Sequence, residues 1–196
     1  MKLYLAKNRS LYLVNLLSGN KLFIIGMPGV GKTTVAERLA VELGFKSVDV
    51  DTLIQRSEHT SVAQIFEGFG ENYFREIETK MIAVVASSSD SAVISLGGGA
   101  VMRDENIQII KKAGLVIWLN ATLDTLQSRL DNDTTTIRPL LAGDVREKLI
   151  GLQSERIEIY RMISDFRVDV DGKTVDTVVD EIVAFASEPK SSPDNT

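Results

Sequence analysis

One stretch of the chain has the residue types and spacing needed to bind phosphate groups. Residues 26–33 read Gly-Met-Pro-Gly-Val-Gly-Lys-Thr, which is the G-x-x-x-x-G-K-[ST] spacing of a P-loop. In such a loop, backbone N–H groups surround the phosphates of a nucleotide, the lysine contacts the outer phosphates and the hydroxyl binds Mg²⁺. We therefore expect a nucleotide site formed by Gly26, Met27, Pro28, Gly29, Val30, Gly31, Lys32, Thr33 and Thr34.

The sequence on either side of this motif favours a functional P-loop. Residues 22–25 are apolar and predict a buried parallel strand, and residues 35–43 carry apolar side chains at helical spacing before Gly44 ends the pattern. A strand, a glycine loop and a helix in this order point the positive end of the helix at an anion. The alternative is a glycine-rich turn that happens to precede a helix.

Other residues that could bind a ligand follow the next predicted strands. Asp49 and Asp51 come at the end of a predicted strand at 46–49, and three consecutive glycines at 97–99 follow a predicted strand at 92–96. In an open α/β sheet, ligands bind at the carboxyl ends of the strands. Glycines there allow a ligand to touch bare backbone. Taken alone, the aspartates could be a solvated loop or a helix cap, and the glycines a tight connection.

Three arginines are candidates for binding an anion, although no local pattern singles them out. Arg75 precedes Glu78 by three residues on a predicted helix, which by itself indicates a surface ion pair. Arg138 lies in residues 131–143, a polar and hydroxyl-rich stretch that could be a mobile flap over a site or an ordinary exposed loop. Arg156 is one of several charges on a long predicted helix, and most charges on such a helix face solvent.

The elements that carry these residues alternate between strands and helices. Such alternation, starting from a P-loop, predicts a three-layer, doubly wound α/β fold with a five-stranded parallel sheet. A small helical insert at about 50–80, interrupted by Gly68 and Gly70, and the flap would lie above the carboxyl edge of that sheet. The predicted strands are 22–25, 46–49, 92–96, 115–119 and 166–170, and the predicted helices are 35–43, 51–56, 61–66, 73–85, 104–112, 122–130, 144–162 and 174–185.

The bulk properties exclude several classes of protein. The net charge of -5 and the pI of about 5.0 argue against nucleic acid or an anionic membrane as the main partner. There are no cysteines, so the chain has no disulfide, thiolate metal site or cysteine nucleophile. No apolar run reaches the roughly 20 residues needed to cross a bilayer. We expect a cytoplasmic protein that acts as a monomer.

The length of 196 residues suits a single domain, which we place at residues 21–187. Residues 188–196 have the polar composition of a disordered tail. Residues 1–20 begin basic and continue apolar, as a signal peptide does, but Asn15 interrupts the apolar run and no clear cleavage site follows. We therefore expect an N-terminal extension that packs on the domain or frays.

Taken in order, the motifs resemble those of the shikimate kinase family, within the nucleoside-monophosphate-kinase-like P-loop proteins. The resemblance extends from about residue 21 to the last helix. It implies transfer of the γ-phosphoryl group of ATP to the 3-hydroxyl of shikimate, with Mg²⁺, as a step in aromatic amino-acid biosynthesis. The matching segments are the P-loop, Asp49-Val50-Asp51, Phe74-Arg75-Glu76-Ile77-Glu78, Leu96-Gly97-Gly98-Gly99-Ala100, Arg138-Pro139-Leu140-Leu141, and Arg156 with Tyr160.

The same resemblance implies a role for each candidate on the substrate side. Arg75 and Arg156 would bind the carboxylate of shikimate, and Glu78 would orient Arg75. Asp51 would accept hydrogen bonds from the ring hydroxyls and is the candidate base. Backbone N–H groups for the substrate would come from Gly97, Gly98 and Gly99.

On the nucleotide side, the resemblance implies that Lys32 and Arg138 neutralise the transferring phosphoryl group. Arg138 would then contact both substrates once the flap closes. Thr33 would bind Mg²⁺, with Asp49 holding it directly or through water.

The chain departs from the family pattern beside the adenine. Many members carry a basic residue early in the flap, but this flap begins Asp131-Asn132-Asp133 and only Arg129 is near. The loop at 171–174 also lacks the expected proline.

The sequence also leaves several other functions open. A gluconate kinase on the same fold would also bind a hydroxylated carboxylate. A nucleoside-monophosphate kinase would need a base-reading pocket, and a GTPase would need an N/T-K-x-D sequence, which is absent. A catalytically inactive scaffold would have kept all the charged positions without using them.

Overall fold

A computed structural model describes residues 21–133 and 143–187 of the chain. The predicted N-terminal extension, the C-terminal tail, most of the flap and Arg138 lie outside these residues. Within them, five parallel strands form one sheet in the order β2-β3-β1-β4-β5. The strands are β1 (Lys21–Gly26), β2 (Lys46–Asp49), β3 (Ala92–Ser95), β4 (Leu115–Asn120) and β5 (Phe166–Asp169). The predicted fold class and all five predicted strands are confirmed.

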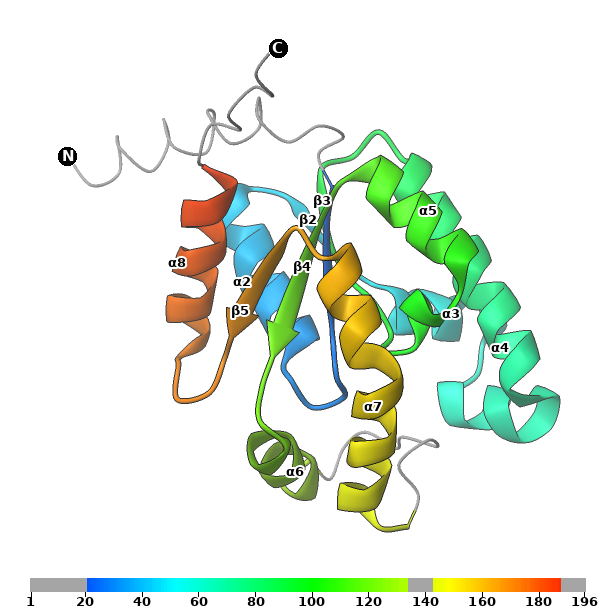
Figure 1. Cartoon of the computed structure of the whole chain (residues 1–196). Helices are drawn as coiled ribbons and strands as arrows, with labels where there is room; N and C mark the ends of the chain where they lie inside the picture. The colour runs from blue at the N-terminus through cyan, green and yellow to red at the C-terminus, as the bar shows by residue number, and fades with distance from the viewer. Residues whose placement is uncertain (1–20, 134–142, 188–196) are drawn as a thin grey trace, which may run out of the picture.

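Helices cover both faces of the sheet, as Figure 1 shows. On one face, α2 (Lys32–Leu43) contacts β1, β2 and β3, and α8 (Val175–Ala186) contacts α2 and β5. On the other face, α5 (Asp104–Ala113) and α7 (Val145–Ile163) contact β4. This burial on both sides explains why the central strands β1, β3 and β4 read as nearly continuous apolar runs, whereas the edge strands β2 and β5 are partly exposed and carry polar residues.

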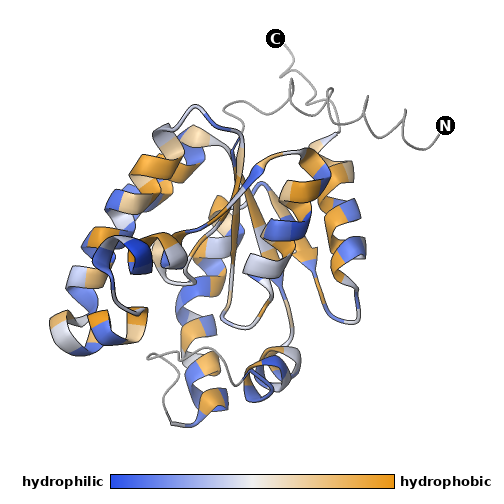
Figure 2. Cartoon of the chain, turned by 180° about the vertical axis from the view of Figure 1, so that it is seen from behind, coloured by the Kyte–Doolittle hydropathy of each residue, from blue (hydrophilic) through white to orange (hydrophobic). Residues whose placement is uncertain are grey.

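The core lies between these layers. In Figure 2 the hydrophobic colour gathers along the central strands. Residues 22–25 of β1 and 116–119 of β4 are at most 2% exposed. No helix in the described ranges is both long and apolar enough to span a bilayer.

Side-chain caps fix the start of several helices, three of which lie in the second half of the chain. Thr122 accepts a hydrogen bond from the backbone of Thr125 at the start of α6 (Leu123–Asp131). Asp144 and Thr174 act in the same way for α7 and α8. A cap of this kind is worth about 1 kcal/mol, because it satisfies an N–H group that has no partner within the helix. Helices α6 and α7 pack against each other at the carboxyl end of the sheet, so the caps at Thr122 and Asp144 help to shape the site.

The predicted helical insert consists of α3 (Val50–Glu58) and α4 (Val62–Ser87). Gly70 kinks α4 with φ 80° and ψ 171°, as its prediction as a helix breaker requires. The same prediction for Gly68 is wrong, because the helix continues through it. A single glycine within a helix costs only about 1 kcal/mol, so the helix tolerates Gly68.

Candidate active site

The predicted site residues meet at the carboxyl edge of the sheet. The P-loop follows β1, Asp49 ends β2, and the three glycines follow β3. Since β2, β3 and β1 are neighbours in the sheet, the loops that follow them lie side by side. They enclose a cavity of about 940 Å³. Its lining includes Lys32, Thr33, Asp49, Asp51, Arg75, Glu78, Gly97, Gly98, Gly99 and Arg156.

The P-loop presents the start of α2 to this cavity. Gly31 precedes the helix with φ 99°, a left-handed conformation that favours glycine, and provides no side-chain cap. The first N–H groups of the helix therefore remain available for an anion. Lys32 donates from Nζ to the carbonyl oxygens of Gly26 at 3.0 Å and Met27 at 3.1 Å. These bonds hold the amine against the loop that would surround the phosphates.

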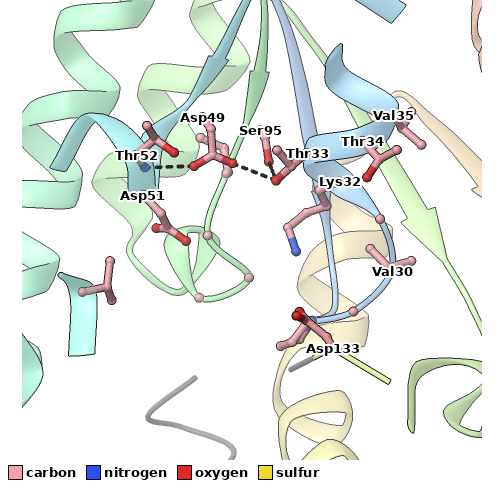
Figure 3. Close-up of a pocket in the computed structure, with 18 of the residues that line it drawn as sticks. Val30, Lys32, Thr33, Thr34, Val35, Asp49, Asp51, Thr52, Ser95 and Asp133 are labelled. Atoms are coloured by element: carbon pink, nitrogen blue, oxygen red, sulfur yellow. Dashed lines mark hydrogen bonds between the residues drawn. The ribbon is translucent and has the colours of Figure 1, made fainter. Parts of the chain in front are cut away.

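Thr33 and Asp49 form a site whose oxygens suit Mg²⁺. Thr33 Oγ1 donates to Asp49 Oδ2 at 2.8 Å, and the other carboxylate oxygen caps α3 by accepting from Thr52 N at 2.9 Å (Figure 3). Ser95 Oγ lies 3.5 Å from Thr33 Oγ1, at the end of β3. A hydroxyl and one carboxylate fit Mg²⁺, which uses few protein oxygens in kinases and takes its other ligands from phosphates and water.

Arg75 and Arg156 converge on the glycine loop although they come from different helices. A Cβ built on Gly99 would lie 2.8 Å from Arg75 Cζ, and one built on Gly98 would lie 3.1 Å from Arg156 Nη1. Both arginines are buried, at 8% and 4% exposed. The i, i+3 spacing of Arg75 and Glu78 predicted an ion pair on the surface, and this predicted location is wrong. The pair exists, with Nη1 to Oε2 at 2.7 Å, but it is inside the protein.

Two carboxylates lie against Gly97 in the same pocket. A Cβ on Gly97 would lie 2.7 Å from Glu78 Oε1 and 3.3 Å from Asp51 Oδ1. Neither of these buried oxygens has a hydrogen-bond partner. Figure 3 shows Asp51 and Lys32 pointing into the same space from opposite sides. An acceptor for hydroxyl groups therefore faces the amine that would hold the phosphates.

Burial raises the proton affinity of the acidic groups in this pocket. The pKa of Asp51 is raised by burial and by the charge of Asp49, while Lys32 and Arg75 oppose the shift. The pKa of Glu78 is raised to about 7 by burial and by Asp51, against the opposing effect of Arg75. A raised pKa suits a carboxylate that must accept a proton from an alcohol.

Tyr160 supports the glycine loop from α7. Its hydroxyl donates to the carbonyl oxygen of Gly98 at 2.6 Å, and burial raises its pKa to about 12. The side chain is 1% exposed and its ring lies 6.0 Å from that of Trp118 in β4. Tyr160 therefore connects the loop to the core.

The segments in which the sequence departs from the family pattern, near Arg129 and at 171–174, also contribute to the cavity lining. We refer to this part of the cavity as its far end. Arg129 donates from Nη1 to Val30 O at 2.8 Å and so lies over the P-loop. Lys173 lines the same region and is paired with Glu181 at 2.8 Å. The remaining lining of this end includes Val170, Val175 and Val178.

Sequence reasoning missed three residues that the structure places around the site. Ser95 was hidden inside an apolar strand, and Glu71 lay outside the predicted helices, in the gap between 61–66 and 73–85. Tyr160 was named among the segments that resemble the family, but no role was predicted for it. An i, i+4 search from Arg75 would have found Glu71, because that spacing brings the two side chains together on a helix.

Comparison with known proteins gives consistent results. Residues 28–187 match the family model described as shikimate kinase. A shikimate kinase of Clostridium botulinum (strain Eklund 17B / Type B) is 40% identical over 163 residues, which is 83% of this chain and 94% of that protein. One of Geobacter sulfurreducens is 39% identical over 171 residues, covering 87% of this chain and 92% of that protein.

Solved structures agree with these sequence comparisons. Shikimate kinase from Acinetobacter baumannii in complex with shikimate superposes with a TM-score of 0.80 at 29% identity, covering 84% of this chain and 91% of that one. A gluconokinase from Sinorhizobium meliloti gives a TM-score of 0.55 at 17% identity, covering 85% of this chain and 91% of that one, and so shares the fold.

Proposed function

The chain belongs to the shikimate kinase family, and from this premise we propose how its residues perform the reaction. The enzyme transfers the γ-phosphoryl group of ATP to the 3-hydroxyl of shikimate and uses Mg²⁺.

Arg75 and Arg156 bind the carboxylate of shikimate. The observation that carries this role is that both guanidinium groups abut the same glycine loop, inside the cavity that the P-loop also lines. Arginine is suited to this task, because its planar donors match a carboxylate. The loop itself would offer backbone N–H groups from Gly97, Gly98 and Gly99.

Asp51 orients the substrate hydroxyl and accepts its proton. Its unpartnered Oδ1 needs a donor, and a ring hydroxyl supplies one. Because phosphoryl transfer passes through a loose transition state, positioning the hydroxyl matters more than removing its proton early. The raised pKa of Asp51 suits late proton acceptance.

Lys32 binds the transferring phosphoryl group, and Thr33 and Asp49 would hold Mg²⁺. A metal ion held there would supply positive charge to the phosphates. Lys32 already lies at the P-loop with its amine on backbone oxygens, and it would exchange these for phosphate oxygens. Arg138, which lies outside the described residues, remains a prediction for the second cation.

The nucleotide base would lie at the far end of the cavity. Arg129 and the valines there can pack against a flat ring from two sides. In this proposal residues 50–80 form the substrate-binding insert and 131–143 the lid. We also propose that the protein is cytoplasmic, in line with its lack of cysteine, and that it acts as a monomer.

The test is substrate binding and turnover in matched arginine variants. Arg156→Ala should weaken shikimate binding by about 2–5 kcal/mol, because it leaves a buried anion half paired. Arg161→Ala is the control, since this residue lies on the same helix and is exposed. Titration calorimetry with shikimate and with ATP measures both effects, and equal losses for the two ligands would reject the carboxylate clamp.

The choice of acceptor separates the proposal from its alternative. A coupled assay should show ADP release that depends on shikimate and not on gluconate or a nucleoside monophosphate. The reverse preference would favour a gluconate kinase on this fold.

A further inference from the structure

The guanidinium group of Arg75 is held on two of its sides by carboxylates from its own helix. Glu78 Oε2 accepts from Nη1 at 2.7 Å. Glu71 Oε1 accepts from both Nε at 3.2 Å and Nη2 at 3.0 Å. Arginine has five N–H groups, and one on each Nη atom remains after these three bonds. The Nη1/Nη2 end of the guanidinium group, called here its terminal edge, carries both of these remaining donors.

From this arrangement we propose that Glu71 is a positioning residue for substrate binding. By occupying the Nε/Nη2 edge, it turns the Nη1/Nη2 edge of Arg75 toward the glycine loop to receive the substrate carboxylate. This inference rests on the proposed clamp role of Arg75.

Glu71 holds Arg75 from outside the cavity. The cavity lining includes Arg75 and Glu78 but not Glu71. The Glu71 side chain is 51% exposed, whereas that of Arg75 is 10% exposed. The Nη-bearing end of Arg75 lies at the glycine loop, where a Cβ on Gly99 would meet Nη2 first, then Cζ at 2.8 Å and Nη1 at 3.0 Å. Glu71 therefore bonds the Nε/Nη2 side of the guanidinium group, and the glycine loop abuts its Nη-bearing end.

The kink at Gly70 explains how Glu71 reaches this position. A Cβ on Gly70 would meet nothing within 4 Å, so the glycine is needed for its φ of +80° and not for space. The helix resumes at the next residue, which places Glu71 in the first turn of the new segment. An acidic residue is favourable there, and Arg75 follows one turn later at i+4.

Glu71 could affect substrate binding in two opposite directions, and this makes the proposal testable. Its negative charge repels an incoming carboxylate, so its loss would tighten binding if charge were all that mattered. Its hydrogen bonds fix the terminal edge of Arg75, so its loss weakens binding if positioning dominates. The proposal requires weaker binding.

The experiment compares Glu71→Ala, Glu71→Gln and Glu76→Gln in the full-length chain. Glu76 is the matched control, because it is an exposed carboxylate next to Arg75 on the same helix. Glu71→Ala should raise the KM for shikimate about fivefold, which matches the loss of a partly exposed ion pair. The kcat and the KM for ATP should change less than about twofold. Glu71→Gln keeps an acceptor oxygen and should rescue part of the effect.

Two further measurements keep the outcome clear. In an Arg75→Lys background, Glu71→Ala should have no additional effect on the KM for shikimate, because lysine has no Nε/Nη2 edge to hold. Thermal unfolding of each variant shows whether it is folded. An unchanged or lower KM for shikimate in Glu71→Ala, or an equal rise in Glu76→Gln, would overturn the proposal. If Arg75→Ala itself left shikimate binding intact, the clamp would fail instead.

Discussion

Glu78 should make the folded protein less stable as the pH rises toward neutrality. Its side chain is fully buried, and burial is the largest cause of the rise in its pKa from 4.5 to about 7. Arg75 opposes the rise, Asp51 adds to it, and Arg103 opposes it weakly. Between these two pKa values the folded chain holds a proton that the unfolded chain has released. Stability from this group is therefore fully present below about pH 4.5 and is lost as the pH rises through about 7.

The size of this effect follows from the change in proton affinity. Each tenfold change in affinity corresponds to about 1.4 kcal/mol, so this shift represents about 3 kcal/mol. Replacing Glu78 with glutamine keeps the shape and removes the titration. The free energy of unfolding of the wild type should thus fall by about 3 kcal/mol relative to Glu78→Gln between pH 4.5 and pH 8.

Urea unfolding of both proteins at the two pH values measures this difference. The constant loss of the Arg75 ion pair in the variant cancels when the two pH values are compared. Glu76→Gln, at an exposed position of the same helix, should follow the wild type. A relative change below about 0.5 kcal/mol, or a wild type that gains stability over the variant as the pH rises, would refute the reasoning.

Three further perturbations test individual contacts of the site. Gly99→Ala should reduce kcat/KM for shikimate by at least about 100-fold, because the new Cβ would lie 2.8 Å from Arg75 Cζ; Gly68→Ala, whose Cβ would meet nothing, should not. Tyr160→Phe removes the hydrogen bond to Gly98 O and should lower the free energy of unfolding by about 1 kcal/mol, with a higher KM for shikimate. Thr33→Ala should raise the Mg²⁺ concentration needed for half-maximal activity, while Thr33→Ser should preserve it; equal metal dependence in both variants would contradict the assignment.

The strands and the P-loop were predictable because their signals are local. The central strands β1, β3 and β4 are short apolar runs that end in glycine or polar residues, and the bounds of all five strands differ from prediction by at most one residue at either end. The observed caps Thr122 and Asp144 stand at the predicted starts of their helices, at 122 and 144. The prediction for Gly68 was wrong because the presence of a glycine does not by itself distinguish a position that the helix tolerates from a kink such as the one at Gly70.

The buried charges were not predictable from local pattern, because distant elements determine their surroundings. Arg156 lies on α7 between exposed charges, and only its contact with the glycine loop after β3 explains its burial. Ser95 became relevant because β3 lies beside β1 in the sheet, which brings its hydroxyl to Thr33. Strand order and helix packing of this kind are features of the tertiary structure, which local sequence patterns do not encode. The family resemblance supplied the arginines that local pattern could not.

The polar atoms that folding leaves without partners identify what the site must bind. Among the described residues, five buried side-chain atoms lack a hydrogen-bond partner, and three of them belong to Asp51, Glu78 and Arg156 around one cavity. Such atoms are rare in native proteins, because each costs about 1–3 kcal/mol. Two are acceptors that need donors, and one is a guanidinium N–H that needs an acceptor. A hydroxylated carboxylate offers both kinds of group at once. Glu78 can itself act as a donor only in its protonated form, which prevails below its pKa of about 7. The instability of this pocket in isolation and its affinity for shikimate therefore have the same physical origin.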